Sequence, residues 1–134
     1  TLTTSSAASD VYKRQTTGLD LTDRKLQEEL KKKGMPWFPA KSFKGSAVLD
    51  TSFIMPECPK EFFLTINQKT RQVGNLKDMI FSFESILLHI SKIVNLKKGD
   101  LIFTGTPEGV GPLVKGDQIE MGFTGHPSKK LTVI

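Results

Sequence analysis

Residues 18–43 read GLDLTDRKLQEELKKKGMPWFPAKSF, and this stretch decides the local fold around it. Thr22 is the predicted N-cap of a helix over residues 23–33, because its hydroxyl can accept a hydrogen bond from a free backbone N–H group. Gly34 can adopt the left-handed conformation that ends a helix, and Pro36 prevents its continuation. The stretch therefore predicts a short helix that is bounded on both sides by its own residues.

Four polar side chains around this helix could reach one ligand. Arg24 and Gln27 are three residues apart, so they lie on the same helix face. Asp20 stands at the end of a predicted short strand, and Lys41 lies in a loop that is rich in aromatic residues. On these residues alone, a salt-bridged surface helix and a solvated loop lysine are the simpler interpretations. A lysine held in apolar surroundings can instead direct its charge at an oxyanion.

A second stretch, IFTGTPEGVGP at residues 102–112, is expected to meet the first one. A strand over residues 101–103 is predicted to run into a glycine-rich loop, and such a loop can expose backbone N–H groups to an anion. The loop is not a Walker sequence, because no Gly-Lys-Ser/Thr follows it, and its glycine spacing does not match a dinucleotide-binding fingerprint. A purely structural turn remains an alternative.

The rest of the chain predicts a mostly β, α+β domain. An extended segment covers residues 47–55, and a hairpin joins residues 62–66 to 72–73 around a turn at 67–70. Apolar residues with a 3.6-residue period predict a second helix over residues 76–94. Closing strands are expected at residues 118–123 and 130–134.

Composition excludes several classes of protein. The chain has 134 residues with a net charge of +5 and a single cysteine, Cys58, which cannot form an internal disulfide. No apolar run approaches the roughly 18 residues of a membrane span, so no membrane partner is expected. No zinc spacing or RNA-binding signature accompanies the lysines, so no nucleic-acid partner is expected either. Residues 1–17 are small, polar and aperiodic, and they are predicted to be a disordered or unrelated leader.

Three motifs together carry a resemblance to a known family. They are Asp20-Leu21-Thr22-x-Arg24-x-x-Gln27, then Trp37-x-x-Ala40-Lys41-Ser42-Phe43, then Gly99-Asp100-Leu101-Ile102-x-Thr104-Gly105-Thr106-Pro107-x-Gly109-Val110-Gly111-Pro112. In this order the chain resembles the fumarylacetoacetate hydrolase family, and within it the acylpyruvase branch of fumarylacetoacetate hydrolase domain-containing proteins. The resemblance covers residues 18–134, which would form the C-terminal part of the catalytic domain.

The resemblance implies rolled β-sheets around a central site, with two peripheral helices. It implies Mg2+ or Mn2+ as cofactor, and hydrolysis of a carbon–carbon bond in acylpyruvates or decarboxylation of oxaloacetate. By the match, Asp20 is a metal ligand, Lys41 and Arg24 are catalytic, and Arg24, Gln27 and Thr106 bind the small 2-oxo acid. The residue types suit this chemistry, because hard divalent ions prefer oxygen ligands and a bidentate arginine fits a planar carboxylate.

The chain also departs from the family pattern. The resemblance implies a Glu-x-Glu metal pair and a lid with a His and a Glu, all upstream of the aspartate, and residues 1–19 match neither. We therefore predict an incomplete fold and an inactive fragment of the enzyme. The alternatives are a non-catalytic module that binds oxo acids or anions, an oxaloacetate tautomerase, and a dimerising β scaffold. The resemblance also implies a homodimer of the full-length protein and a mitochondrial or cytosolic location.

Overall fold

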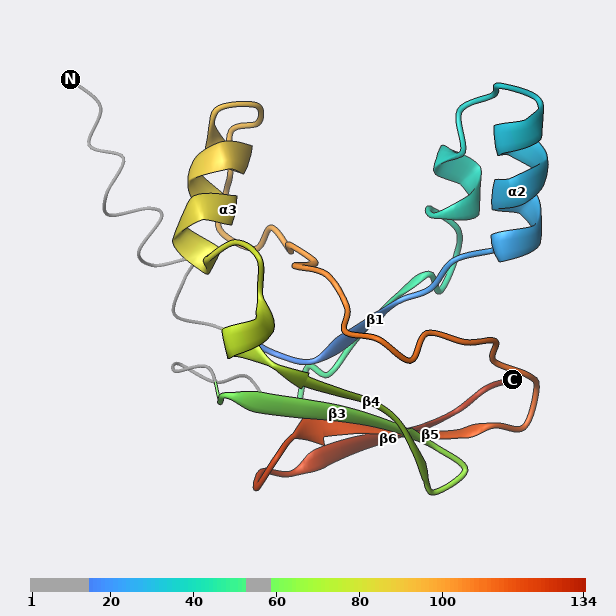
Figure 1. Ribbon diagram of the computed structural model, residues 1–134, viewed down its shortest axis with the longest axis vertical. Coiled ribbons are helices and arrows are strands. Elements are labelled where there is room, and N and C mark those ends of the chain that lie inside the picture. The colour runs from blue at the N-terminus through green and yellow to red at the C-terminus, as the bar shows by residue number, and fades with distance from the viewer. Residues whose placement is uncertain (1–14, 53–58) are drawn as a thin grey trace.

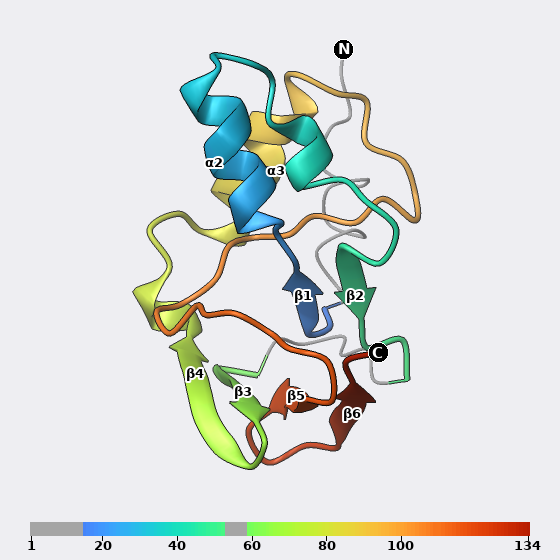
Figure 2. The same cartoon turned by 90° about the vertical axis from the view of Figure 1, so that its right-hand side faces the viewer.

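The computed structural model of the protein describes residues 15–52 and 59–134. In these residues the chain forms a two-stranded sheet, a four-stranded sheet of order β4-β3-β5-β6, and two α-helices, with every strand pair antiparallel. Both helices lie on the same side of the four-stranded sheet, and the small sheet lies between the helices and the four-stranded sheet (Figures 1 and 2). The predicted mostly-β class is confirmed. The elements are β1 (Gly18–Asp20), α2 (Arg24–Lys32), β2 (Ala47–Leu49), β3 (Glu61–Ile66), β4 (Lys69–Asn75), α3 (Phe83–Ser91), β5 (Gln118–Phe123) and β6 (Ser128–Thr132), with short 3-10 helices η1 (Phe38–Ala40) and η2 (Leu76–Asp78).

The core is centred on β5, which lies between β3 and β6. Ile119, Met121 and Phe123 are all less than 5% exposed. They alternate along the strand, so they point to one face of the sheet. Burial of these side chains stabilises the fold, because apolar area removed from water is the main stabilising term. The same face borders the space between the sheet and the helices.

The β3–β4 hairpin is confirmed, with a tighter turn than the sequence predicts. Asn67 and Gln68 both have positive φ values, 50° and 65°, as a two-residue type I′ turn requires. Ile66 pairs with Lys69 directly across this turn. Asparagine tolerates the left-handed region, which explains how the chain turns here without a glycine.

Helix α2 begins one residue later than predicted. Asp23 is the N-cap, and its carboxylate accepts a hydrogen bond from the Leu26 N–H at 3.0 Å. The prediction of Thr22 as the cap is wrong, because the Thr22 hydroxyl instead accepts a hydrogen bond from Lys41. The predicted stop is confirmed: Gly34 has a φ of 63° and its N–H donates to the carbonyl of Lys31.

The predicted helix over residues 76–94 is two shorter elements. Residues 76–78 form η2, Met79 is extended, and Ser82 starts α3 by accepting a hydrogen bond from the Ser85 N–H. Apolar periodicity alone does not show this break, because a side-chain cap competes with the helix at Ser82. Ile80 is 91% exposed as a result, although the periodicity places it on the core face.

Two other predicted strands are wrong: one is absent among the described residues, and the other is shorter than predicted. Residues 101–103 pair with no strand in the part of the chain that the structure describes. The extended segment predicted over 47–55 is a strand only at β2, because the Asp50 carboxylate accepts a hydrogen bond from the Ser52 N–H and turns the chain. Residues 53–55 of that prediction, and residues 1–14 of the predicted leader, lie outside the described residues. None of the helices described is long and apolar enough to cross a membrane.

Gly74 provides a test of the sheet packing. It pairs with Phe62, and a Cβ atom added at Gly74 would overlap the tip of the Phe62 ring. We expect Gly74→Ala to lower the free energy of unfolding by about 1–3 kcal/mol, because the ring must leave its place. Urea unfolding of the single variants and of the Phe62→Leu/Gly74→Ala double variant measures this. In the double variant the shorter leucine side chain should reduce the loss of stability caused by Gly74→Ala. If the losses of the two single variants simply added up in the double variant, the proposed contact would be contradicted.

Asp117 provides a test of the link between the hairpin and β5. Its carboxylate accepts hydrogen bonds from the Val114 N–H at 2.9 Å and from the Asn67 amide at 2.8 Å. The Val114 bond first, and then the Asn67 bond, hold the pKa of Asp117 below its ordinary value of 3.8, against the opposing effect of burial. The folded state favours the charged carboxylate. Its contribution to stability is therefore complete at pH values above 3.8, and it is lost as pH falls through the lower pKa of the folded state.

We therefore expect Asp117→Ala to lower the urea midpoint at pH 7. The gap between the two proteins should stay constant down to about pH 5 and shrink as pH falls below the unfolded pKa of about 4. Urea titrations between pH 7 and pH 3 measure the gap. A gap of the same size throughout would show that the Asp117 carboxylate contributes nothing through its charge.

Candidate active site

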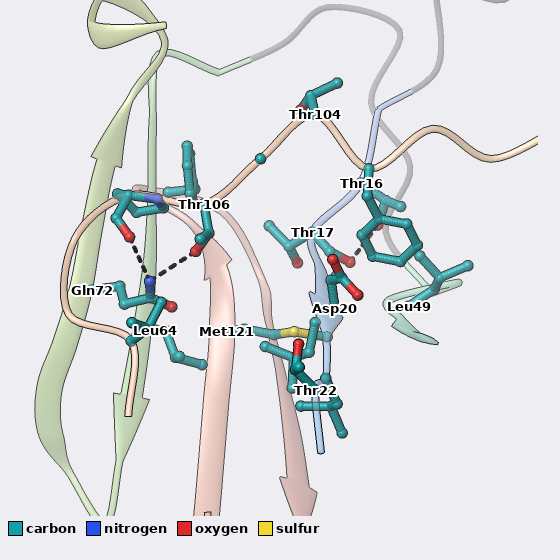
Figure 3. A pocket seen from close by; sticks show the side chains of 18 of the residues that line it. Thr16, Thr17, Asp20, Thr22, Leu49, Leu64, Gln72, Thr104, Thr106 and Met121 are labelled. Atoms are coloured by element: carbon teal, nitrogen blue, oxygen red, sulfur yellow. Dashed lines mark hydrogen bonds between the residues drawn. The ribbon is translucent and has the colours of Figure 1, made fainter. Parts of the chain in front are cut away.

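A large cavity lies between the helical side and the sheet. Its volume is about 1280 Å³, and residues from many separate parts of the chain line it. The polar part of the lining comes from β1, the start of α2, Lys41 and the loop before β5, while β3, β5 and α3 supply apolar side chains. Figure 3 shows Asp20 and Thr22 on one side of this space, with Thr106 on another side and Met121 between them. Among the predicted site residues, Asp20, Arg24, Lys41 and Thr106 line the cavity, and Gln27 does not.

Lys41 connects the η1 loop to the β1–α2 junction. Its ammonium lies 2.7 Å from Asp20 Oδ1 and 2.8 Å from Thr22 Oγ1. The Lys41 side chain is 31% exposed and that of Asp20 is 49% exposed, so the ion pair itself adds little to stability. An ammonium has three hydrogens, and these two contacts leave one for a ligand in the cavity. The pair therefore fixes where a positive charge stands.

Two backbone hydrogen bonds explain why Lys41 reaches Asp20. The Asp23 N–H donates to the carbonyl of Ala40 at 2.9 Å, and the Leu21 N–H donates to the carbonyl of Ser46 at 2.7 Å. Ala40 is fully buried, which anchors η1 against the start of α2. These contacts place the Lys41 backbone where its side chain can reach Asp20.

Arg24 and Gln27 lie on one face of α2, as their spacing predicts. Arg24 Nη1 donates to Gln27 Oε1 at 3.2 Å. Gln27 is only 6% exposed. Its buried side-chain oxygen therefore holds the Arg24 guanidinium through this hydrogen bond. Its predicted role as a direct substrate contact stays a prediction. The remaining N–H groups of Arg24 are available to an anion, since a guanidinium carries five.

Thr106 enters the cavity from the loop before β5. Its Oγ1 accepts a hydrogen bond from Gln72 Nε2 at 2.8 Å. Gln72 lies on β4 and was not among the residues singled out by the sequence. The sequence holds no signal for it, because an exposed β4 residue and a cavity residue look alike until the strand register is known.

The described residues by themselves do not fit a metal centre with three carboxylates. They contain no group of three or more His, Cys, Asp or Glu side chains placed to hold an ion. Asp20 could supply one ligand, and it is paired with the Lys41 ammonium. Mg2+ keeps its waters unless several anionic ligands compensate. The role of Asp20 as a metal ligand therefore stays a prediction.

The cavity offers cations and a hydroxyl to a small anion with more than one oxygen. Its lining holds the cations Arg24, Lys25 and Lys41, which Asp20, Asp23 and Asp100 balance in formal charge, and Thr106 adds a hydroxyl. Such fixed donors stabilise negative charge that develops on an oxygen, because they need no reorganisation when the charge appears.

Comparisons with known proteins agree with this architecture. The family model "Fumarylacetoacetate (FAA) hydrolase C-terminal" matches residues 2–134. The chain is 44% identical over 119 residues to "Oxaloacetate tautomerase FAHD1, mitochondrial" of Mus musculus, covering 86% of this chain and 54% of that protein. It is 41% identical over 111 residues to "Oxaloacetate tautomerase FAHD2, mitochondrial" of Oryza sativa subsp. japonica, covering 80% of this chain and 49% of the rice protein. The chain thus spans about half the length of these curated relatives.

Solved structures share the fold. Fumarylpyruvate hydrolase from Pseudomonas aeruginosa, solved in complex with Mn2+ and pyruvate, superposes with a TM-score of 0.81 at 30% sequence identity, covering 91% of this chain and 54% of the hydrolase. Sequence and fold therefore agree over nearly the whole chain. The chain belongs to the fumarylacetoacetate hydrolase family.

Proposed function

We propose that the cavity binds the carboxylate and oxo groups of a small 2-oxo acid, and that the chain forms part of an enzyme acting on that acid. The observation that supports this most directly is the Lys41 ammonium. Asp20 and Thr22 hold it in a cavity that Arg24 and Thr106 also line. A fixed cation and a guanidinium in one cavity suit an anion in which a carboxylate stands next to a carbonyl oxygen.

Each residue then has a separate task. Arg24 binds the substrate carboxylate through two parallel N–H bonds. The third Lys41 hydrogen donates to the oxo oxygen, where negative charge accumulates as the acid becomes an enolate. The Thr106 hydroxyl donates to a second substrate oxygen and fixes the orientation of the molecule.

Two reactions of the family share this enolate. The mouse and rice relatives are named as oxaloacetate tautomerases, and the Pseudomonas relative is named as a fumarylpyruvate hydrolase. Tautomerisation moves a proton between carbon and oxygen, whereas hydrolysis releases an enolate as a carbon–carbon bond breaks. Because both place charge on the same oxo oxygen, the same cavity residues serve either one. The names of the more similar relatives favour oxaloacetate as the substrate.

The relatives also support a cofactor and a cellular location for the enzyme. The Mn2+ of the Pseudomonas structure supports a divalent ion as cofactor, whose remaining ligands would come from outside the described residues. The names of the mouse and rice proteins support a mitochondrial location. Pairing of two copies in the full-length protein stays a prediction from the resemblance.

A binding measurement tests the proposed site. Oxalate is a suitable probe, because it presents adjacent carboxylate oxygens like those of an enolised 2-oxo acid. We expect Arg24→Ala and Lys41→Ala each to weaken oxalate binding by about 10- to 100-fold, as the loss of a charge-assisted hydrogen bond of about 1.5–3 kcal/mol implies. Isothermal calorimetry with and without Mn2+ measures the affinity.

The matched control is Lys32→Ala, which removes one positive charge from the last turn of the same helix. It should leave oxalate binding unchanged. An equal loss in this variant would show that net charge, and not the cavity, attracts oxalate. An unchanged affinity in Lys41→Ala would favour the β scaffold.

The second candidate is a non-catalytic anion-binding module. The absence of a three-ligand group among the described residues favours it, since cations without a metal centre can bind an oxo acid but do little chemistry. Binding that is independent of Mn2+ and is lost in Arg24→Ala would support this module.

Turnover separates the module from an enzyme. We expect the 134-residue chain to show no measurable Mg2+- or Mn2+-dependent loss of acetylpyruvate or of enol-oxaloacetate. Absorbance assays measure both reactions, with the full-length mouse relative on oxaloacetate as the positive control. Turnover at the rates of ordinary enzymes, about 1–10³ per second, would contradict the predicted inactivity.

A further inference from the structure

The loop over residues 101–114 carries Thr106 but has no regular structure of its own. It runs from the α3 side of the molecule to the start of β5 (Figure 1). Gly105 and Gly109, on either side of Thr106, both have positive φ values, 110° and 93°, which residues other than glycine rarely adopt. A loop of this kind needs an anchor outside itself to hold one side chain in place.

Gln72 is that anchor. Its Nε2 lies 2.8 Å from Thr106 Oγ1, 3.0 Å from the carbonyl oxygen of Pro107 and 3.3 Å from that of Glu108. Figure 3 shows the Gln72 amide directed at the Thr106 side of the loop. Three successive residues of the loop therefore bind one side-chain atom.

The two carbonyl oxygens fix the orientation of this amide. A carbonyl can only accept a hydrogen bond, so the Gln72 atom that faces both of them must be the NH2 group. Its hydrogens then serve Thr106, at the shortest distance, and the two carbonyls. Because the Thr106 oxygen already accepts from Gln72, its own proton is left to donate.

A β-bulge places Gln72 on the cavity face. Leu64 pairs with Gln72 and the next residue, Thr65, pairs with Thr70, so Arg71 is an extra residue on β4. Without this extra residue, Arg71 would stand opposite Leu64 and Gln72 would point to the other face of the sheet. Bulges commonly redirect a side chain beside a functional site.

The loop also packs closely against the bulge. A Cβ atom added at Gly109 would overlap the carbonyl oxygen of Arg71, and one added at Gly111 would lie 3.1 Å from its guanidinium. Only glycine at position 109 combines this approach with its positive φ. The bulge thus sets both the direction of Gln72 and the distance of the loop.

We propose that Gln72 is a positioning residue that holds the Thr106 loop against β4 and leaves the Thr106 hydroxyl proton free to donate into the cavity. The part of this inference that concerns ligand binding rests on the proposed function. The part that concerns the loop does not, and the two can be measured separately.

Two variants of similar size test the inference. Gln72→Met keeps the length of the side chain and removes both donors. Gln72→Glu replaces the donors with a carboxylate that faces two carbonyl oxygens, and protonation of that carboxylate restores one donor. Gln118→Met is the control, because the Gln118 amide is exposed and contacts only Thr132 and Gly116 among the described residues.

The first readout is the 15N order parameter of the loop amides at residues 105–111. We expect a value near that of rigid backbone, about 0.85, in the wild type, and a fall towards about 0.6 in Gln72→Met and in Gln72→Glu at pH 7. At about pH 4.5, near the ordinary pKa of glutamate, Gln72→Glu should recover part of the difference while Gln72→Met does not. If Gln72→Glu lowered the order parameters only by disturbing the packing, protonation of the glutamate would not restore them.

The second readout is oxalate binding by calorimetry. We expect Gln72→Met to weaken it about three- to tenfold, in line with one lost neutral hydrogen bond, and Gln118→Met to leave it unchanged. A loop in Gln72→Met that stays as rigid as in the wild type would overturn the inference. If the wild type binds no oxalate, the proposed function fails, and the order parameters still decide the role of Gln72.

Discussion

The contact of Lys41 with Asp20 and Thr22 is the interaction on which the candidate site depends. It joins residues that are 21 positions apart in the chain, and two backbone hydrogen bonds beside it join the same segments. Together they bring the η1 loop to the junction of β1 and α2. The ion pair is too exposed to matter much for stability, so its consequence is geometric. It gives the cavity a positive charge at a defined place.

The two sides of the cavity are built by different means. Asp20, Arg24 and Lys41 are positioned by short elements that cap and anchor one another. Thr106 is positioned by a side chain from the sheet, across an irregular loop. Charge therefore comes from the helical side, and the hydroxyl comes from the sheet side. The proposed substrate, with a carboxylate next to an oxo group, would use both sides at once.

Local chemistry in the sequence predicted the parts of this arrangement that depend on near neighbours. The stop of α2 at Gly34, the β3–β4 hairpin and the shared face of Arg24 and Gln27 follow from spacing of a few residues. Predictions failed where two local signals competed, as at Ser82, which caps α3 and divides the predicted helix. The sequence could not indicate Gln72, because its direction depends on a bulge that only strand pairing reveals. Motifs identified the family, whereas the anchoring of Thr106 required the fold.

The position of the Thr106 loop has a second consequence, for solubility. Among the described residues β4 is an edge strand of the four-stranded sheet, and an open edge can pair with a strand of another molecule and start aggregation. The bulge at Arg71 interrupts that edge, and the loop covers the Arg71 carbonyl at Gly109. The opposite edge, β6, carries Lys129 and Lys130, whose charges oppose such pairing. The loop that carries Thr106 thus also shields part of this sheet edge.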